Sequence, residues 1–414
     1  MREMKDSGIE WVGTIPQDWQ LSKIGNLYTQ RNEKVSDKDY QPLSVTMQGI
    51  LPQLATAAKT DDGDNRKLVR VGDFAINSRS DRRGSCGISP LDGSVSLINI
   101  ILTPRTAMHP GYHNWLFHTT LFADEFYKWG HGIVADLWTT RWQEMKSITV
   151  PVPEYAEQER IAAFLDAECA EIDAVLEKTR ASIEEYKKLK QAVITQAVTK
   201  GVRGDRPMKD SGIEWIGDIP AEWDVLNLVA HTSMLTPMRD RPENLDGPIP
   251  WVRIEDFEGK YIESSKAGLG VSMKTVKEMN LKVYPVGTIL CTSSCIMGKC
   301  AIVSRELVSN QRFIGIIPDR TTDKTYLYYL MTSNAERMNF LSTGALQANL
   351  SRSAFEHLKV QFPPYSEQQE IAAYLDDKCE KIDELILKKQ QYLTEIENYK
   401  KSLIYEYVTG KREV

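Results

Sequence analysis

Two acidic residues and a lysine in the second half of the sequence form the first group whose types suit catalysis. Asp246 stands ahead of Glu258 and Lys260, and metal-dependent nucleases use two acids and a lysine around an ion that activates water. The same residue types are also common in solvated β-turns. The turn is the simpler interpretation, so the sequence predicts no nuclease site here.

Two further stretches approach known motifs without completing them. Ser293 to Cys300 (SSCIMGKC) approaches a phosphate-binding loop, but serine replaces its first glycine and Cys300 replaces the serine or threonine that binds magnesium. Phe362 to Tyr365 (FPPY) approaches the Asn/Asp-Pro-Pro-Tyr motif of amino-group methyltransferases. Phenylalanine cannot hydrogen-bond the target amine, and no glycine-rich cofactor loop accompanies it. Neither stretch predicts catalysis.

The cysteines and histidines follow no metal-site pattern. Cys291, Cys295 and Cys300 lack the paired two-residue spacing of structural zinc sites, and the six histidines form no HxxxH or HExxH pair. We therefore predict buried free thiols, no catalytic residue and no cofactor in this chain. Six cysteines in 414 residues, no apolar run near ~18 residues and no signal-peptide pattern favour a reduced, cytoplasmic protein.

An internal duplication indicates which elements must position any functional residues. MKDSGIEW occurs at Met4 to Trp11 and again at Met208 to Trp215. The longer stretch PEYAEQERIAAFLDAECAEID at 153–173 corresponds to PPYSEQQEIAAYLDDKCEKID at 363–383. The order of short motif, unmatched block and long motif therefore occurs twice. We predict two halves related by a pseudo-twofold axis.

The long motifs predict two long helices. Apolar residues recur at steps of three or four from Glu157 to Thr199, and at matching positions in the second copy, without an internal glycine or proline. Gly201 and Gly410 are expected to end the helices, and Ser366 with Gln369 suggests a capping box in the second. A helix of roughly 65 Å cannot bury its apolar stripe alone. The two helices are therefore predicted to pack as an antiparallel coiled coil.

The blocks between the repeated motifs share little sequence but have a similar layout. Short β-rich runs punctuated by Gly, Asn and Pro occur at 71–77 and 87–104 in the first block, and at 285–294, 299–304 and 313–318 in the second. The predicted fold class is α+β, with two β-rich domains separated and joined by the two long helices. A common scaffold with different loops is typical of two binding modules with different targets.

These motifs together resemble the specificity subunit of type I restriction-modification systems, over essentially all 414 residues. The most specific marks are the repeated start MKDSGIEWVGTIPQDW, the Pro-then-Glu-Gln helix starts at 157–158 and 367–368, and the Val-Thr helix ends at 198–199 and 408–409. In that family each variable block is a target recognition domain that reads one half of a split DNA site. The repeated helices hold these domains apart and bind methyltransferase subunits.

The resemblance implies target recognition domains at 1–152 and 204–362, and spacer helices at 153–203 and 363–414, whose length sets the gap in the DNA site. It implies a non-catalytic subunit that binds double-stranded DNA, two methyltransferase subunits and, through them, restriction subunits. S-adenosylmethionine, ATP and magnesium are expected in those partners. The residues predicted to contact a partner are Glu157, Gln158, Glu367 and Gln368. The alternative is a stand-alone coiled-coil scaffold protein without DNA specificity.

Base recognition requires forked donors and amides on loops, with Arg or Lys for guanine and Asn or Gln for adenine. The residues predicted to contact DNA in the first block are Asn77, Arg79, Ser80, Arg82, Arg83, His131 and Arg141. Those in the second block are Ser293, Ser294, Lys299, Asn310, Gln311, Arg312, Gln347, Asn349 and Arg352. A solvated hairpin is the alternative for the arginine-rich loop, and some of these residues are expected to contact only phosphate or solvent.

Overall fold

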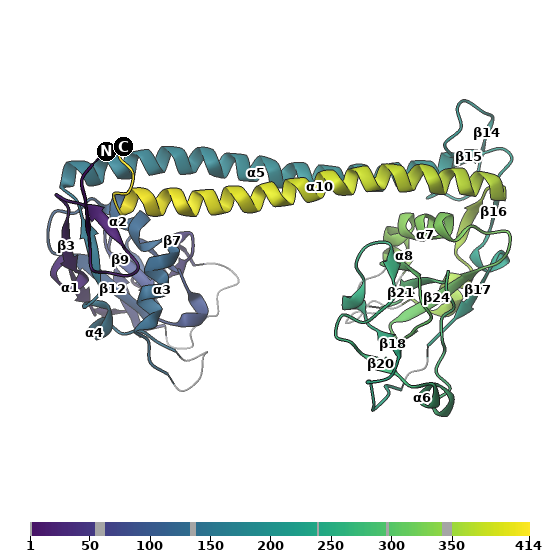
Figure 1. Ribbon diagram of the computed structural model, residues 1–414, viewed down its shortest axis with the longest axis horizontal. Coiled ribbons are helices and arrows are strands. Elements are labelled where there is room, and N and C mark those ends of the chain that lie inside the picture. Colours follow the sequence, from purple (N-terminus) through teal and green to yellow (C-terminus); the bar gives the residue numbers. More distant parts are fainter. Residues whose placement is uncertain (1, 54–62, 133–137, 238–239, 295–297, 342–349) are drawn as a thin grey trace. The chain divides into compact units, whose positions relative to one another are not determined.

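The computed structural model describes residues 2–53, 63–132, 138–237, 240–294, 298–341 and 350–414. It divides into two compact units (Figure 1): unit 1 is Met1–Arg180 with Gln390–Val414, and unit 2 is Ala181–Lys389. Each unit thus combines one globular part with a half of each long helix, whereas the domains predicted from sequence begin and end at the helix ends. Within the described ranges, no helix is both long enough and apolar enough to cross a membrane.

The globular part of unit 1 is built from short antiparallel strands and short helices. Its elements are β1 (Met4–Asp6), β2 (Thr14–Pro16), β3 (Gln20–Lys23), α1 (Ile24–Leu27), β4 (Tyr28–Arg31), β5 (Lys34–Val35), β6 (Leu43–Thr46), β7 (Gly49–Pro52), β8 (Arg66–Val69), β9 (Phe74–Asn77), a 3-10 turn (Ser80–Arg82), β10 (Cys86–Ile88), β11 (Gly93–Val95), β12 (Asn99–Pro104), α2 (Pro110–Phe117), α3 (Thr120–Lys128), α4 (Trp142–Met145) and β13 (Thr149–Val152). The main sheet has the strand order β10-β9-β12-β4, and β3 pairs with β13.

The globular part of unit 2 repeats this plan with different connections. Its elements are β14 (Met208–Asp210), β15 (Asp218–Pro220), β16 (Asp224–Asn227), a 3-10 turn (Leu228–Ala230), β17 (Thr232–Leu235), β18 (Ile249–Val252), a 3-10 turn (Ile254–Asp256), β19 (Tyr261–Ile262), β20 (Gly270–Val271), α6 (Met273–Glu278), β21 (Ile289–Thr292), β22 (Cys300–Val303), β23 (Val308–Ser309), β24 (Phe313–Pro318), α7 (Lys324–Ser333), α8 (Ala335–Leu341), α9 (Arg352–Glu356) and β25 (Lys359–Phe362).

The main sheet of unit 2 has the order β17-β24-β21-β22-β19. Its first four strands therefore correspond one for one to β4, β12, β9 and β10 of unit 1. The β-rich runs predicted in both blocks are confirmed as strands of these sheets. Helices α2 and α3 in unit 1, and α7 and α8 in unit 2, lie outside the predicted runs and pack against the sheets and the long helices.

The two long helices have nearly the predicted bounds, α5 at Tyr155–Lys200 and α10 at Tyr365–Val408. Gly201 and Gly410 follow them with φ of 75° and 70°, the left-handed conformation that favours glycine after a helix. The predicted capping box is wrong, because Ser366 lies inside the first turn. The carbonyl of Pro364 instead accepts hydrogen bonds from the backbone of Glu367 and Gln368.

Within each unit, α5 and α10 pack antiparallel. Lys400 Nζ lies 2.6 Å from Asp173 Oδ1 in unit 1, and Lys190 Nζ lies 2.6 Å from Asp383 Oδ2 in unit 2. Lys190 and Lys400 hold the same position in the two copies of the repeat, as do Asp173 and Asp383. The two ion pairs are therefore equivalent under the internal repeat.

The predicted apolar stripe is mostly buried. Ile161 and Leu165 of α5 join the core of unit 1, and the matching Ile371 and Leu375 of α10 join the core of unit 2. The stripe prediction is wrong at one matched pair of positions. Leu189 is 48 % exposed and Tyr399 is 52 % exposed, because a strict seven-residue repeat drifts around a straight helix.

The repeated MKDSGIEW motif forms the same hairpin in both units. Met4 pairs with Pro16 across β1 and β2, as Met208 pairs with Pro220 across β14 and β15. Each hairpin leads to a tryptophan, Trp19 or Trp223, that is almost fully buried. The indole nitrogen of each donates to a glutamate in the first turn of a long helix. The duplicated motif therefore joins each globular part to its helices.

Candidate functional site

The catalytic near-motifs do not assemble in the structure. Lys260 pairs with Asp376 at 2.5 Å, and Glu258 pairs with Lys266, so the two residues that could join Asp246 have other partners. The segment from Ser293 to Cys300 connects two antiparallel strands rather than a strand and a helix. Among the described residues, no three His, Cys, Asp or Glu side chains are grouped as metal ligands would be.

Three distant segments of unit 1 meet at the end of strand β9. The Asn77 amide donates to the carbonyl of Ser85 at 2.9 Å, and the Ser78 amide donates to the carbonyl of Ile98 at 3.3 Å. The Thr140 amide then donates to the carbonyl of Ser78 at 3.0 Å. We call residues 77–85, 96–98 and 138–141 loop site 1.

The corresponding strand of unit 2 ends in the same way. The Thr292 amide donates to the carbonyl of Lys299 at 2.9 Å, and the Ser293 amide donates to the carbonyl of Arg312 at 2.8 Å. The Leu350 amide donates to the carbonyl of Ser293 at 2.9 Å. We call residues 292–294, 298–299, 310–312 and 350–352 loop site 2. The two units therefore hold three loops together by the same pattern of main-chain bonds.

Loop site 1 brings together the two separate segments predicted in the first block. Thr139 forms β-bridges with both Arg79 and His131, so the arginine-rich loop lies beside the later segment. Arg141 is the N-cap residue of α4 at the same place and is exposed. The hydroxyl of Tyr127 in α3 also binds this loop, because it donates to the carbonyl of Asn77 at 2.9 Å. Burial raises the pKa of Tyr127, so this hydroxyl keeps its proton.

The side chains predicted in loop site 1 differ in availability. The guanidinium of Arg79 has no hydrogen bond or ion pair with any described residue. Arg82 is exposed, and its guanidinium lies 3.7 Å from the carboxylate of its neighbour Asp81. Arg83 pairs with Asp124. Asn77 is buried, and its Oδ1 accepts from the Arg79 amide at 3.0 Å. Asn77 therefore shapes the loop, which does not fit the predicted direct contact with DNA.

Loop site 2 shows a similar division. Ser293 is buried and serves as the junction of the three segments. Asn310 Oδ1 accepts from the Arg312 amide at 3.1 Å. Gln311 and Arg312 have exposed side chains, as does Lys299, whose ammonium lies 5.9 Å from the centre of the Phe257 ring.

The remaining predictions for the second block have different outcomes. Ser294 is half-buried beside Ser293. Arg352 is exposed and pairs with Glu356 at 2.7 Å within the short helix α9. Gln347 and Asn349 lie outside the described residues. The structure therefore offers Lys299, Gln311, Arg312 and Arg352 as the exposed donors of loop site 2.

Several residues of loop site 1 lie outside the set predicted from the sequence. Ser96 and Leu97 occupy the place that Asn310 and Gln311 occupy in unit 2. Trp138 and Thr139 directly precede Thr140, whose amide makes the third main-chain bond of the site. Leu97 is 37 % exposed and Trp138 is 36 % exposed. Apolar side chains can contact the thymine methyl group, but a search for forked polar donors overlooks them. Aligning the two blocks by their strand ends would have found these positions.

The four residues predicted to bind a partner lie largely inside their own units. Glu367 is fully buried, with Trp223 Nε1 donating to its Oε2 at 3.1 Å and Arg206 Nη1 lying 2.6 Å from its Oε1. Glu157 repeats this arrangement with Trp19, at 3.0 Å, and with Arg2, and its side chain is 16 % exposed.

The neighbouring glutamines are buried as well. Gln158 Oε1 accepts from the His109 amide at 3.0 Å, and Gln368 Oε1 accepts from the Asp323 amide at 2.8 Å. Each glutamine thus holds the residue that precedes α2 or α7. Burial of these side chains does not fit the predicted contact with a partner. Their bonds instead fasten the start of each long helix to the globular part, because buried polar groups need internal partners.

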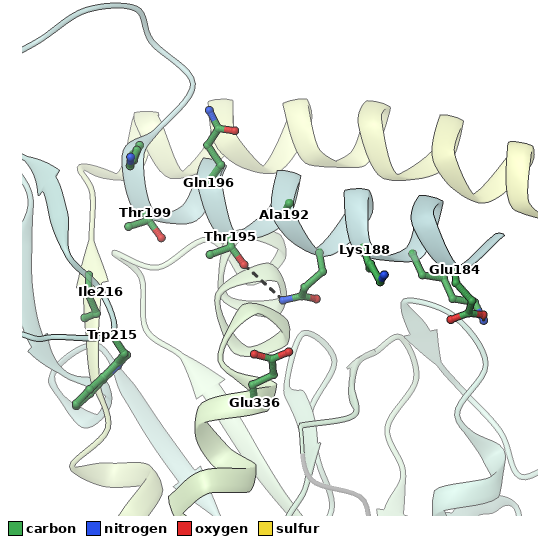
Figure 2. Close-up of a pocket in the computed structure, with 12 residues that line it drawn as sticks. Glu184, Lys188, Ala192, Thr195, Gln196, Thr199, Trp215, Ile216 and Glu336 are labelled. Atoms are coloured by element: carbon green, nitrogen blue, oxygen red, sulfur yellow. Dashed lines mark hydrogen bonds and ion pairs between the residues drawn. The ribbon is translucent and has the colours of Figure 1, made fainter. Parts of the chain in front are cut away.

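A groove of about 960 Å³ lies in unit 2, away from loop site 2. Figure 2 shows Thr195, Thr199 and Glu336 around it, together with Trp215 and Ile216 of the repeated hairpin motif. Trp215 is 44 % exposed, whereas its counterpart Trp11 in unit 1 is 7 % exposed. None of the predicted DNA-contacting residues lines this groove, so it is not part of the loop site.

Comparison with known proteins connects this geometry to a family. The family described as "Type I restriction modification DNA specificity domain" matches residues 224–398, a span that begins at β16 and includes all of loop site 2. Residues 224–398 form a type I restriction-modification DNA specificity domain. The resemblance noted in the sequence is thereby confirmed.

Relatives that match this chain come from Methanocaldococcus jannaschii. The type I restriction enzyme MjaIX specificity subunit is 36 % identical over 176 residues, which is 40 % of each chain. The putative MjaX specificity subunit is 26 % identical over 66 % of this chain and 61 % of its own. The chain thus spans less than two thirds of the length of the MjaIX subunit and of the MjaX subunit. The MjaVIII specificity subunit is 24 % identical over 97 % of this chain and 94 % of its own.

Solved structures share the fold of the specificity domain and of the remaining chain. A chain from a study of complex assembly and conformational transition of the type I R-M system matches with a TM-score of 0.75, 13 % identity, 96 % of this chain and 99 % of that one. The HsdS subunit from Thermoanaerobacter tengcongensis matches with a TM-score of 0.52, 15 % identity, 96 % of this chain and 98 % of that one. At these identities the likeness concerns the fold alone.

Proposed function

We propose that this chain is the non-catalytic DNA-recognition subunit of a type I restriction-modification complex, and that each loop site reads one half of a bipartite duplex site. The observation that carries the proposal is the equivalence of the two loop sites. Both gather three loops at the end of the same strand, with the same main-chain bonds and different exposed side chains. Two similar frames with different contact residues suit two different half-sequences. The family match does not favour a stand-alone scaffold protein.

The proposed partners are two copies of a methyltransferase subunit, which would supply S-adenosylmethionine chemistry, with restriction subunits bringing ATP and magnesium. Apolar side chains that are exposed at matched positions of the two helices support two equivalent docking surfaces. Val175 and Leu385 are 39 % and 41 % exposed, and Leu189 and Tyr399 are 48 % and 52 % exposed. Repeated exposure of large apolar groups is typical of surfaces that a partner covers.

Substitution of these residues should remove the partner copies one at a time. We expect Leu189→Asp to bind one methyltransferase copy instead of two, Tyr399→Asp likewise, and the double variant none. A charge in the centre of an apolar interface is left without a partner and opposes binding. The mass of the assembled complex distinguishes the three compositions.

The matched control is Lys187→Asp, which introduces the same charge on the same helix. Two residues rotate about 200° around a helix, so Lys187 faces away from Leu189. This variant should retain two copies. A complex that holds two methyltransferase subunits in the Leu189→Asp, Tyr399→Asp double variant would show that the docking surface lies elsewhere.

Recognition of the two half-sites should be separable by mutation. We expect Arg79→Ala with Arg82→Ala to relax or weaken reading of one half-site, by ~1 to 3 kcal/mol for each lost bidentate base contact. Gln311→Ala with Arg312→Ala should affect only the other half-site. Mapping of methylated sites on genomic DNA, with the methyltransferase subunits present, measures both effects.

Arg83→Ala provides the graded control, because the guanidinium of Arg83 is already paired with Asp124. It should alter recognition less than the change at Arg79. If the arginine substitutions in unit 1 changed the bases read in both half-sites, the assignment of one half-site to each loop site would be wrong.

A further inference from the structure

Two free cysteines face each other at the base of the loop between β21 and β22. Cys291 is fully buried and Cys300 is 7 % exposed. They are direct partners in the antiparallel register, and their Sγ atoms lie 2.7 Å apart. The loop that they flank carries Ser293, Ser294 and Lys299, which belong to loop site 2.

The backbone geometry at this pair suits a covalent bond. The adjacent pair, Thr292 and Lys299, is hydrogen-bonded through the Thr292 amide and the Lys299 carbonyl. Pairs alternate along an antiparallel ladder, so Cys291 and Cys300 occupy a non-hydrogen-bonded position, where Cα atoms are ≈ 4.5 Å apart and side chains are closest. Disulfides span Cα separations of ≈ 4.4 to 6.8 Å. A bond between these residues therefore requires little movement of the strands.

Unit 1 provides an internal comparison at the same position. Strands β9 and β10 correspond to β21 and β22, and the equivalent partners there are Ile76 and Cys86. Both are buried. An isoleucine therefore fills the place of Cys291 in the same frame, which shows that packing alone does not require a second thiol.

We propose that Cys291 and Cys300 are a dithiol which a peroxide oxidises to an intrachain disulfide, fixing the base of the loop that carries part of loop site 2. The thiolate of Cys300, the more exposed partner, attacks one peroxide oxygen and becomes a sulfenic acid, releasing the first water. The sulfur of Cys291 then attacks the sulfenic sulfur, forming the S–S bond and releasing the second water. Two thiols and one hydrogen peroxide thus give one disulfide and two waters.

Burial limits the rate of this reaction. Removal from water raises the pKa of Cys291 well above that of a free thiol, so it reacts as the resolving partner rather than the first nucleophile. Closure should therefore take place over minutes to hours under excess peroxide. The effect on DNA recognition rests on the proposed function, whereas the thiol chemistry does not.

The first test is chemical and uses the full chain. After treatment with hydrogen peroxide, denaturation and alkylation, we expect a mass lower by two hydrogen atoms and a peptide pair joined through Cys291 and Cys300. Cys86, Cys169 and Cys379 should remain available for alkylation. Dithiothreitol should restore the starting mass. Alkylation of both Cys291 and Cys300 after prolonged oxidation would overturn the proposal.

Two variants make the test specific. Cys291→Ile installs the pair that unit 1 already uses, so it should fold and show no mass loss. Cys295→Ser removes the third thiol of this segment, which lies outside the described residues, and should still form the bond. Loss of the bond in Cys295→Ser would show that Cys295, not the opposed pair, carries the chemistry.

The second test measures the consequence in unit 2. Amide hydrogen exchange in β21 and β22 should slow by about tenfold or more on oxidation, because a disulfide restricts the open states of a short loop. Oxidation should not change the exchange rates of the equivalent strands β9 and β10. It should also leave the exchange rates of β21 and β22 unchanged in the Cys291→Ile variant. If the disulfide formed without slower exchange in β21 and β22, fixing of the loop base would be disproved. Absence of sequence-specific DNA binding would instead contradict only the proposed function.

Discussion

Replacement of Glu367 by glutamine is expected to lower the free energy of unfolding of unit 2 by about 3 kcal/mol, the low end for breaking a buried ion pair, because Arg206 keeps its second partner Glu222 at 3.0 Å. Glu367 is fully buried and lies 2.6 Å from Arg206 Nη1. Glutamine keeps an acceptor for the Trp223 indole but removes the charge that Arg206 faces. Amide exchange in β21 and β24 should quicken about a hundredfold, since every 1.4 kcal/mol is tenfold.

Glu157→Gln in unit 1 is the matched control, because Glu157 binds Trp19 and Arg2 in the same arrangement. Its side chain is 16 % exposed and that of Arg2 is 21 % exposed. Water can therefore solvate part of the released charge, and the loss should be about 1 kcal/mol. Equal effects of the two variants would contradict the argument from burial.

Removal of one heptad from both long helices should abolish modification of the original bipartite sites. We propose deletion of 179–185 from α5 with 389–395 from α10, which occupy matched positions in the repeat. Each helix shortens by ~10.5 Å while its apolar stripe stays nearly in phase. The sites that the variant methylates should have the same two half-sequences, separated by a gap about three base pairs shorter.

The control for this deletion shortens α5 alone. The ion pairs from Lys400 to Asp173 and from Lys190 to Asp383 depend on the register of both helices, so the single deletion should destabilise the protein. Methylation mapping with the paired-deletion variant and with the single-deletion variant distinguishes the two outcomes. If the paired deletion changed the bases read and left the gap unchanged, the helices would not set the spacing.

Much of the helical framework could be predicted from the sequence, because long apolar periodicity and a duplication are strong signals. The starts of α5 and α10 were located to within a few residues, and the β-rich runs became strands of the main sheets. Helices such as α2 and α7 were missed. Tyr112 and Tyr326 show the reason, since both are fully buried on short helices that have apolar residues on more than one side, which weakens the periodic signal.

The candidate sites were only partly predictable, for a different reason. The arginine-rich loop and the later segment at His131 and Arg141 were identified by residue type, but their proximity depends on bonds made by Ser78 and Thr139 to distant parts of the chain. The family resemblance implied partner contacts at Glu367 and Gln368, because sequence alone does not show that a polar residue is enclosed by its own domain. Conversely, Leu97 and Trp138 carry no polar signal.

The main-chain ties of the loop sites bear on how such a protein can evolve. Each loop site is tied by three main-chain bonds. In these bonds Ser85, Ile98 and Thr140 of unit 1 hold the positions that Lys299, Arg312 and Leu350 hold in unit 2, and the same hydrogen bonds form with different residues. Bonds made by backbone amides and carbonyls require no particular side chain. Mutations of the exposed side chains on these loops can therefore accumulate with little cost to folding, and a lineage can explore new DNA targets one half at a time while the other half stays unchanged.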